Sequence, residues 1–471
     1  MGLLIGVGNT DPQFPYTSLW YGIKINLNHG GKDTKDGKIE RVGNLDLHRQ
    51  LPIQKKIRRF VANADGSVNY WLGADDSTKK EGGGNANLNG TDGNVLLYKP
   101  DYYRRMEFDN GYLLVAISEV ALPGFVKMKE QARSPWFATM NRKTDTPASV
   151  CCLTWGSDGK PKRDDSGLLV FTSNAADYRG GTNDSSRDGT NKSELGMPAC
   201  SMNKATVRAK FKKLNADMTC HGGGWRFREE MGWLMAIEFG SLDSQATYTA
   251  EKTEDGFAQG GIGTQSVDWG EWSTFNNNRP FIPCGITAKL GNNTGRVSYT
   301  IKNWETGTDK EIFVPSYRGW ETPQQYLWEE NDDVIVWHGK PSDGDTSLLY
   351  VCEDATKFTT PSDTSTAVPD GYKEVGALPR TSGYIAAMAV GNGWSCPTSV
   401  AGGAANKNYG DYYWYPTVTD DSGWGWYQLL SCAHAYYAEA SGVRCAGAVN
   451  RGAVTSTNFG FPFVQEIAKA A

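Results

Sequence analysis

The sequence lacks three features that would assign it quickly to a class of protein. No stretch approaches the ~18 consecutive apolar residues that a membrane-spanning helix needs, so membrane insertion is not expected. No Cys-x-x-Cys pair occurs, which argues against a zinc ribbon and against a thioredoxin-type redox site. Histidine is scarce, with 5 residues scattered over 471, so spacing alone indicates no metal-binding triad.

An excess of positive charge is also missing. The formal net charge is −5 at pH 7, whereas a nucleic-acid-binding protein normally carries a basic stripe. The apolar segment 1–8 contains no basic residue and is followed at once by Asp11 and Pro12, so we expect no secretory signal peptide. The 9 cysteines are expected to be free, buried thiols of a protein made in a reducing cytoplasm.

Glycine and tryptophan are the abundant residues, with 55 and 16 copies. Many glycines with many aromatics favour short strands joined by tightly turned loops. Apolar runs of strand length occur at 18–25, 94–98 and 112–117, separated by turn-forming residues. We therefore interpret residues 1–135 as a β-rich module. The length of the chain exceeds what one core usually holds, so at least one further domain is expected.

Two helices are expected in the remaining residues, 136–471. The first runs through 205–211 and begins at a capping residue, Ser201 or Asn203, and the second covers 231–239. Beyond them the helix signals largely vanish, and short apolar runs joined by long loops remain. The sequence thus predicts an α+β fold class with an exposed loop face.

The stretch 395–463 combines aromatic residues with glycine and small polar residues. This mixture is typical of a recognition surface, because rigid rings give contact area at low entropic cost while Ser, Gly and Asn give adaptable hydrogen bonds. The same rings can instead form the core of a glycine-rich domain, and for any single ring both interpretations stay open. Their polar neighbours favour exposure of the group as a whole.

Several short motifs, taken in order along the chain, resemble one known family. They are 256–263, 281–285, Tyr-Arg-Gly-Trp-Glu-Thr-Pro at 317–323, and Asn-Phe-Gly-Phe at 458–461. These segments resemble the C-type lectin fold of the formylglycine-generating-enzyme type. The pattern is most similar to the variable proteins of diversity-generating retroelements, particularly those that phages carry as tail receptor-binding proteins. In the N-terminal module, 41–49 and 118–124 resemble segments that precede the lectin-type domain in such proteins.

The resemblance implies a variable region at about 424–463, where codons are replaced by copies made with errors at adenines. An asparagine codon copied in this way yields Tyr, Ser, Cys, His or Arg, among others, but not Trp. Trp424 and Trp426 are therefore expected to be fixed scaffold or rim of the site. The expected ligand-binding positions are Tyr427, Ser431, Cys432, His434, Tyr436, Tyr437, Arg444, Asn450 and Arg451.

The resemblance also implies a non-enzymatic function without cofactor or metal, that of a phage-type receptor-binding protein of the virion. Its expected partner is a bacterial cell-surface protein or glycan. The N-terminal module is expected to contact other tail or virion proteins, and a homotrimer fits the symmetry common in tail fibres. Neither nucleic-acid binding nor membrane insertion is expected.

Two other classes of protein stay open. An enzyme on the same scaffold would be a surface-glycan hydrolase, or a copper oxidase that uses Cys432 and Cys445. A structural virion decoration protein would use the aromatic surface as a subunit interface. Calcium-dependent sugar binding is disfavoured, because the nearest acidic-amide clusters, at 303–305 and 330–333, do not reproduce the lectin triplets, and we expect these residues to be solvated.

Overall fold

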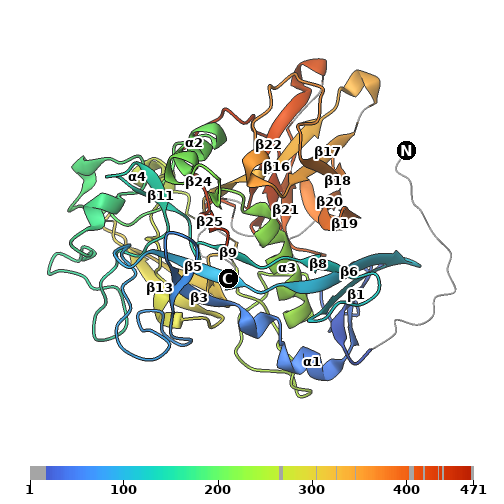
Figure 1. Ribbon diagram of the computed structural model, residues 1–471, viewed down its shortest axis with the longest axis horizontal. Helices are drawn as coiled ribbons and strands as arrows, with labels where there is room; N and C mark the ends of the chain where they lie inside the picture. Colours follow the sequence, from blue (N-terminus) through green and yellow to red (C-terminus); the bar gives the residue numbers. More distant parts are fainter. Residues whose placement is uncertain are drawn as a thin grey trace.

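The computed structural model describes residues 17–467 except 265–268, 304, 325, 345, 403–407, 417–419, 433, 438 and 439. The segment for which no signal peptide is expected lies outside these described residues. Strands dominate and helices are few, so the expected α+β class is confirmed (Figure 1). No helix in the described part of the chain is long and apolar enough to cross a membrane.

An antiparallel sheet of five strands, in the order β2-β1-β7-β6-β8, forms the first layer. Tyr21, Ile23 and Ile25 alternate along β1 and are fully buried, as expected for a sheet with one face on the core. The strands expected at 18–25 and 112–117 are confirmed. The elements of this layer are β1 (Trp20–Asn26), β2 (Ile39–Gly43), α1 (Leu45–Gln50), β6 (Tyr102–Asp109), β7 (Tyr112–Ser118) and β8 (Val126–Met128).

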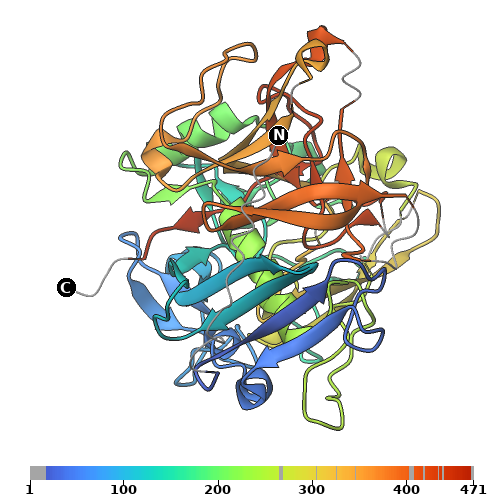
Figure 2. The ribbon, with the colours of Figure 1, turned by 90° about the vertical axis from the view of Figure 1, so that its right-hand side faces the viewer.

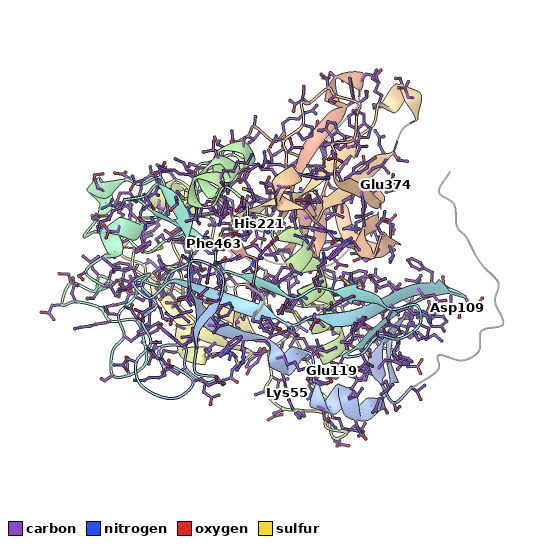
Figure 3. The ribbon with its side chains drawn as sticks, viewed as in Figure 1. Lys55, Asp109, Glu119, His221, Glu374 and Phe463 are labelled. Atoms are coloured by element: carbon purple, nitrogen blue, oxygen red, sulfur yellow. The ribbon has the colours of Figure 1, made fainter. Side chains whose placement is uncertain are left out.

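A second sheet joins the two ends of the chain. Its order is β12-β25-β9-β5-β3-β4. Strand β25, near the C-terminus, lies between β9 and β12 and pairs with both of them. His221 of β12 and Phe463, just before β25, mark this junction near the centre of the molecule (Figure 3). This sheet therefore combines strands from residues 1–135 with strands from residues 136–471. Its strands are β3 (Arg58–Ala62), β4 (Val68–Trp71), β5 (Asn94–Lys99), β9 (Gln131–Arg133), β12 (Cys220–His221) and β25 (Val464–Gln465).

Helix α3 (Trp225–Phe239) passes between the five-stranded sheet and the large C-terminal sheet (Figures 1 and 2). Every residue of α3 except Arg226 is buried, which explains why its sequence is apolar nearly all round. The Asp333 carboxylate accepts hydrogen bonds from the backbone N–H groups of Trp225 and Arg226, each at 3.1 Å. These bonds satisfy amides that a helix leaves free at its start.

Helix α2 (Lys204–Leu214) begins where the sequence indicates a cap. The Asn203 side chain accepts a hydrogen bond from the Thr206 backbone N–H at 2.9 Å. Both expected helices are thus confirmed, and one short helix that was not expected, α4 (Trp272–Asn276), lies in the loop-rich part. The 3-10 turns of the described chain are η1 (Gln54–Lys56), η2 (Ala175–Tyr178), η3 (Ser185–Arg187), η4 (Ala288–Leu290), η5 (Pro341–Asp343), η6 (Ala355–Lys357) and η7 (Asp421–Gly423).

Strand β16 (Trp328–His338) is the hub of the nine-stranded C-terminal sheet. It pairs with β17 and β22 on its two sides and with β24, which the Asn-Phe-Gly-Phe motif supplies. The other strands of this sheet are β17 (Ser347–Cys352), β18 (Tyr372–Leu378), β19 (Gly383–Gly391), β20 (Trp394–Ala401), β21 (Tyr412–Trp414), β22 (Gly425–Ser431), β23 (Ala446–Gly447) and β24 (Phe459–Gly460). Smaller sheets contain β10 (Thr139–Asn141) with β11 (Thr146–Ala148), and β13 (Gly295–Ile301), β14 (Lys310–Tyr317) and β15 (Trp320–Glu321).

The acidic run 329–333 is buried in β16, so the expectation that residues 330–333 are solvated is wrong. The pairing of β16 with β22 shifts register between Glu330 and Ile335. The carboxylates of Glu329, Asp332 and Asp333 form ion pairs within the fold. Asp332 forms a two-pronged ion pair with Arg208 of α2, with 2.8 Å between Nε and Oδ2. These acidic side chains are structural, because they tie both helices to the central strand.

Candidate functional site

The end of β22 opens into a loop whose two ends are held together. Cys432 adopts a left-handed backbone conformation with φ of 61°, which turns the chain out of the strand. Its backbone N–H donates to the Cys445 carbonyl at 2.7 Å, and β22 then pairs with β23 through Ser431 and Ala446. The loop 432–445 is therefore fixed at its base rather than free at both ends.

Contacts with other elements hold the loop in place. The Ala435 N–H donates to the Tyr326 carbonyl at 3.0 Å. The Tyr436 hydroxyl donates to the Asn278 side chain at 3.2 Å and accepts from the Ser273 N–H at 2.9 Å. The loop is thus anchored to the region of α4 as well as to its own strand.

Half-buried and exposed rings form one connected row on this loop and the neighbouring strands. His434 lies against Tyr437, with 4.4 Å between ring centroids, and Tyr437 lies 5.0 Å from Trp414 of β21. The row continues from Trp414 to Tyr412 at 4.8 Å and, on its other side, from His434 to Tyr436 at 5.1 Å. We call these five residues the aromatic patch. Tyr437, 38% exposed, is its most accessible member.

Buried tryptophans form the floor of the aromatic patch. Trp328 of β16 lies 5.0 Å from Trp414 and 5.9 Å from His434, and Trp272 of α4 lies 5.8 Å from Tyr436. Both tryptophans are at least 93% buried. Because aromatic pairs in such tilted and edge-on contacts stabilise one another, the exposed rings rest on a rigid base.

The patch presents an uncharged surface at neutral pH. Burial lowers the pKa of His434 to about 4, so its imidazole is neutral at pH 7. The other four members are tyrosines and a tryptophan. Such a surface favours contacts through ring faces and hydroxyl groups rather than through ion pairs.

Three of the expected ligand-binding residues are buried, so the expectation that they face a ligand is wrong for them. Ser431 and Cys432 are 1% and 0% exposed, and Tyr427 is 8% exposed. The Ser431 hydroxyl accepts from the Asn331 side chain at 2.9 Å, and the Cys432 sulfur from the Arg228 guanidinium at 2.8 Å. These contacts serve the fold, because all of the partners are themselves buried.

Arg444 anchors the loop from below. Its guanidinium donates to the backbone carbonyls of Gly232 and Leu242 and lies 4.9 Å from the centre of the Trp233 ring of α3. Its backbone N–H donates to the Asp411 carboxylate at 2.7 Å. All of these interactions point into the molecule, so this geometry supports a structural role for Arg444 and does not support ligand contact.

The remaining expected residues form a separate group at the start of β22. The Arg451 guanidinium donates to the carbonyls of Trp424 and Trp426 at 2.8 and 3.0 Å and lies 4.0 Å from the centre of the Tyr427 ring. The Asn450 carbonyl accepts from the Gln428 N–H. Since a strand rises ~3.3 Å per residue, the contacts of this group lie roughly 10–20 Å along β22 from Ser431, where the patch loop begins. Trp426 is 2% exposed, which agrees with its expected scaffold role.

Tyr412 and Trp414 belong to the patch but are missing from the sequence-based candidates. Both point to the same side of β21, while Tyr413 between them is fully buried. Tyr384 of β19 stands directly opposite Tyr412, with 5.1 Å between ring centroids, and extends the row of rings. The four consecutive aromatic residues at 412–415 favour a strand, but this run does not alternate, so the sequence does not show which of its rings are exposed.

Comparison with protein-family models, with curated proteins and with solved structures finds no match to this chain. A function must therefore be inferred from the residues and their geometry. The described residues contain no group of three or more His, Cys, Asp and Glu side chains placed to hold a metal ion. What they do contain is an uncharged row of rings on an anchored loop.

Proposed function

We propose that this protein is a non-enzymatic receptor-binding protein that meets its partner through the aromatic patch. The observation that supports the proposal is the packing of exposed Tyr437 between His434 and Trp414, in tilted contacts, over the buried Trp328. Rings held in this way have lost their conformational freedom before a partner arrives, which lowers the entropic cost of binding.

The resemblance to variable proteins of diversity-generating retroelements extends the proposal. On a C-type lectin scaffold of that kind, His434, Tyr436 and Tyr437 would be diversified positions, while Tyr412 and Trp414 lie before the variable region and would be constant. The partner would be a bacterial cell-surface protein or glycan, and the protein would belong to a phage tail. Multiple copies, such as a homotrimer, would raise a weak single-site affinity through avidity.

Exposed apolar residues support attachment through the N-terminal module. Large hydrophobic side chains that stay in water are usual at protein–protein interfaces when they gather on one part of a molecule. In the described part of 1–135 they are 43–53% exposed: Leu19, Leu45, Phe108, Val120 and Val126. They are half of the ten exposed large hydrophobic side chains in the described part of the chain. In the proposed arrangement this module contacts other virion proteins and leaves the aromatic patch free for the receptor.

Replacing Tyr437 with alanine tests the proposal. We expect Tyr437→Ala to weaken binding of the labelled full-length protein to a panel of whole bacterial cells by roughly 30-fold or more, the loss typical of a central aromatic anchor. The matched control is Phe313→Ala, which removes another exposed ring, 45% accessible, from β14. Equal binding by the two variants, both with wild-type melting temperatures, would contradict the proposal.

The copper-oxidase alternative receives little support from the cysteine pair. Cys432 and Cys445 do come together, but both are at most 1% exposed. Burial and the hydrogen bond with Cys432 raise the pKa of the Cys445 thiol, so the thiolate that would bind copper is disfavoured.

The decoration-protein alternative predicts that the patch is covered by a neighbouring subunit. Light scattering of wild type and Tyr437→Ala separates these ideas, because only a patch-mediated assembly dissociates on substitution.

A further inference from the structure

Lys99 and Gln131 stand directly opposite each other on neighbouring strands, β5 and β9, of the second sheet. Directly opposite residues of an antiparallel pair point to the same face of the sheet, with their Cβ atoms about 5 Å apart. Leu97 and Arg133, two residues away on the same strands, form the neighbouring pair on that face. The Arg133 guanidinium lies 5.2 Å from the centre of the Phe227 ring of α3. Lys99 and Gln131 therefore point toward α3.

Glu230 of α3 bridges the two side chains. Its Oε2 lies 2.7 Å from the Lys99 Nζ, and its Oε1 accepts from the Gln131 Nε2 at 2.5 Å. The side chains of Lys99 and Glu230 are 0% and 1% exposed. The Lys99 amine also donates to the Lys129 and Pro100 carbonyls at 2.8 and 3.1 Å, which holds it beside the start of β9. A primary amine, a carboxamide and a carboxylate thus meet in one cluster.

This combination of groups can form an amide bond between two side chains. A lysine amine is a nucleophile once it has lost its proton, and burial lowers the pKa of the Lys99 ammonium, although the Glu230 charge partly offsets this effect. Glu230 contacts both reacting groups, so it is placed to move protons between them. Gln131 supplies the carbonyl carbon, Cδ. It is half-buried and lines a cavity of about 460 Å³, through which a small leaving group can depart.

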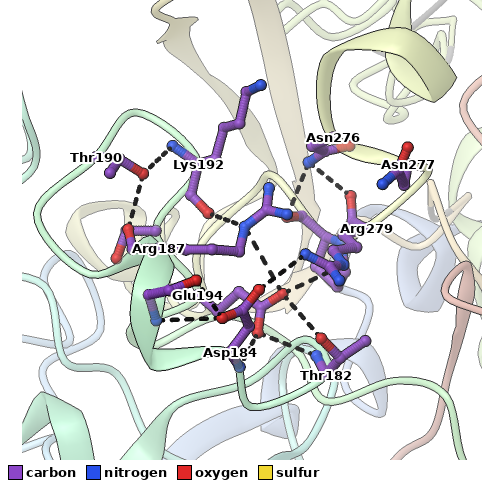
Figure 4. A network of polar contacts seen from close by, with 12 residues as sticks. Thr182, Asp184, Arg187, Thr190, Lys192, Glu194, Asn276, Asn277 and Arg279 are labelled. Atoms are coloured by element: carbon purple, nitrogen blue, oxygen red, sulfur yellow. Dashed lines mark hydrogen bonds and ion pairs between the residues drawn. The ribbon is translucent and has the colours of Figure 1, made fainter.

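Another buried carboxylate, that of Glu194, has different partners (Figure 4). It accepts from the backbone N–H groups of Thr182 and Asp184 at 3.1 and 2.9 Å, and it faces the Arg279 guanidinium at 3.6 Å. A guanidinium stays protonated in proteins, so these contacts provide no amine for the same reaction. What distinguishes Glu230 is its contact with a buried lysine amine and a carboxamide at the same time.

We propose that Lys99 and Gln131 become joined by an isopeptide bond after the chain has folded, with Glu230 as the catalytic carboxylate. Glu230 takes a proton from the Lys99 ammonium, and the freed lone pair of Nζ attacks Cδ of Gln131. The Nζ–Cδ bond forms and the Cδ–Nε2 bond breaks. The two protons that Nζ loses pass through Glu230 to the departing nitrogen, which leaves as ammonium. Atoms and charge balance, and the reaction needs no oxidant, reductant or co-reactant.

The bond ties together the sheet that joins the two ends of the chain. Strand β9 pairs with β5 on one side and with β25 on the other. A covalent link between β5 and β9 closes a loop of the chain, and such a link restricts the unfolded state. The proposal does not depend on the proposed function, because none of the three residues belongs to the aromatic patch.

Mass spectrometry of the intact, full-length protein tests the proposal. We expect the wild type to be lighter than its sequence mass by one ammonia molecule, about 17 Da. After trypsin digestion, the peptides 81–104 and 130–133 should appear as one joined species. A succinimide at Asn89-Gly90 would also release ammonia, but it would leave these two peptides separate. A wild-type protein with its full sequence mass, or with separate peptides only, would overturn the proposal.

Three variants assign the role of each group. Glu230→Gln keeps the shape of the catalytic side chain and should reduce the joined peptide by roughly tenfold or more, and Lys99→Met should abolish it. The matched control is Glu229→Gln, which breaks a similarly buried ion pair of α3, with Arg104, and leaves the three reacting groups in place. This folded control should keep the joined peptide. An undiminished bond in Glu230→Gln would overturn the catalytic role of the carboxylate, and the wild-type masses decide the bond itself even if a variant does not fold.

Discussion

Glu329 is the residue whose replacement tests the buried electrostatics most directly. It is fully buried at the start of β16, and its carboxylate is shared by two equally buried arginines. Arg133 of β9 donates to it at 2.9 and 3.4 Å, and Arg228 of α3 donates at 3.3 Å. Glu329 also stands opposite Ser431, next to the turn that begins the patch loop.

Glu329→Gln keeps the shape of the side chain and removes its charge. The two guanidinium groups then lose their shared carboxylate inside the protein, and breaking a buried pair in this way costs about 3–5 kcal/mol. With an unfolding entropy of roughly 2.1 cal/mol/K per residue, this cost lowers the Tm by ~3–5 °C if the 471 residues unfold together. The variant is expected to be less stable, and not more stable, than the wild type, because the site is buried and water cannot replace the lost partner.

Calorimetry of the wild type and two variants measures this effect. The matched control is Asp101→Asn, which breaks the surface pair with Lys127, whose side chains are 49% and 53% exposed. Exposed pairs contribute about 0–1 kcal/mol, so the control should melt within about 1 °C of the wild type. If Glu329→Gln melts no lower than Asp101→Asn, the two arginines do not need the carboxylate and the reasoning fails.

Three further predictions concern other buried groups. Burial raises the pKa of the Asp411 carboxyl from 3.8 to about 7, partly offset by Arg444, so folding favours its protonated form. The stability contributed by this group therefore falls as the pH rises from about 4 to 7. The Tm of Asp411→Asn should accordingly rise relative to that of the wild type between about pH 5 and pH 8. A Tm difference between the two proteins that does not change with pH would count against this. All 9 cysteines are free and buried, so a thiol reagent should react with almost none in the native protein and with 9 after denaturation; rapid labelling of the native protein would disagree. A Cβ at Gly22 would lie 2.1 Å from the Val115 carbonyl oxygen, so Gly22→Ala should destabilise by about 1–3 kcal/mol in urea titrations, whereas Gly82→Ala, with no atom within 4 Å, should be nearly neutral; similar midpoints for both would refute the strain argument.

Local pattern was sufficient for the regular elements. The apolar runs at 18–25, 94–98 and 112–117 form strands β1, β5 and β7, because alternation and β-branched residues carry the strand signal within a few residues. Helix α2 begins at Asn203, one of the two caps indicated by the sequence, since a cap is a contact between neighbours in the chain. These are properties that a short window of sequence contains.

The candidate site was only partly predictable. The sequence indicates an aromatic surface near the carboxyl end, and Tyr437 is indeed exposed. Which rings gather there depends on the pairing of β19, β21 and β23, which brings Tyr412 and Trp414 beside a loop about twenty residues further along the chain. The codons from which Cys432 could arise do not indicate that its side chain points into the protein and contacts Arg228.

The sequence by itself determined the fold class, the strands and helices that local pattern specifies, and the absence of an excess of positive charge. Tertiary structure alone decided that the acidic run 329–333 is buried and that the expected ligand-binding residues divide between the two ends of β22. The physical reason is that burial and ion pairing depend on partners from far along the chain, as Arg133 and Arg228 are for Glu329. A carboxylate is solvated or buried according to whether such partners reach it, and no local pattern encodes that.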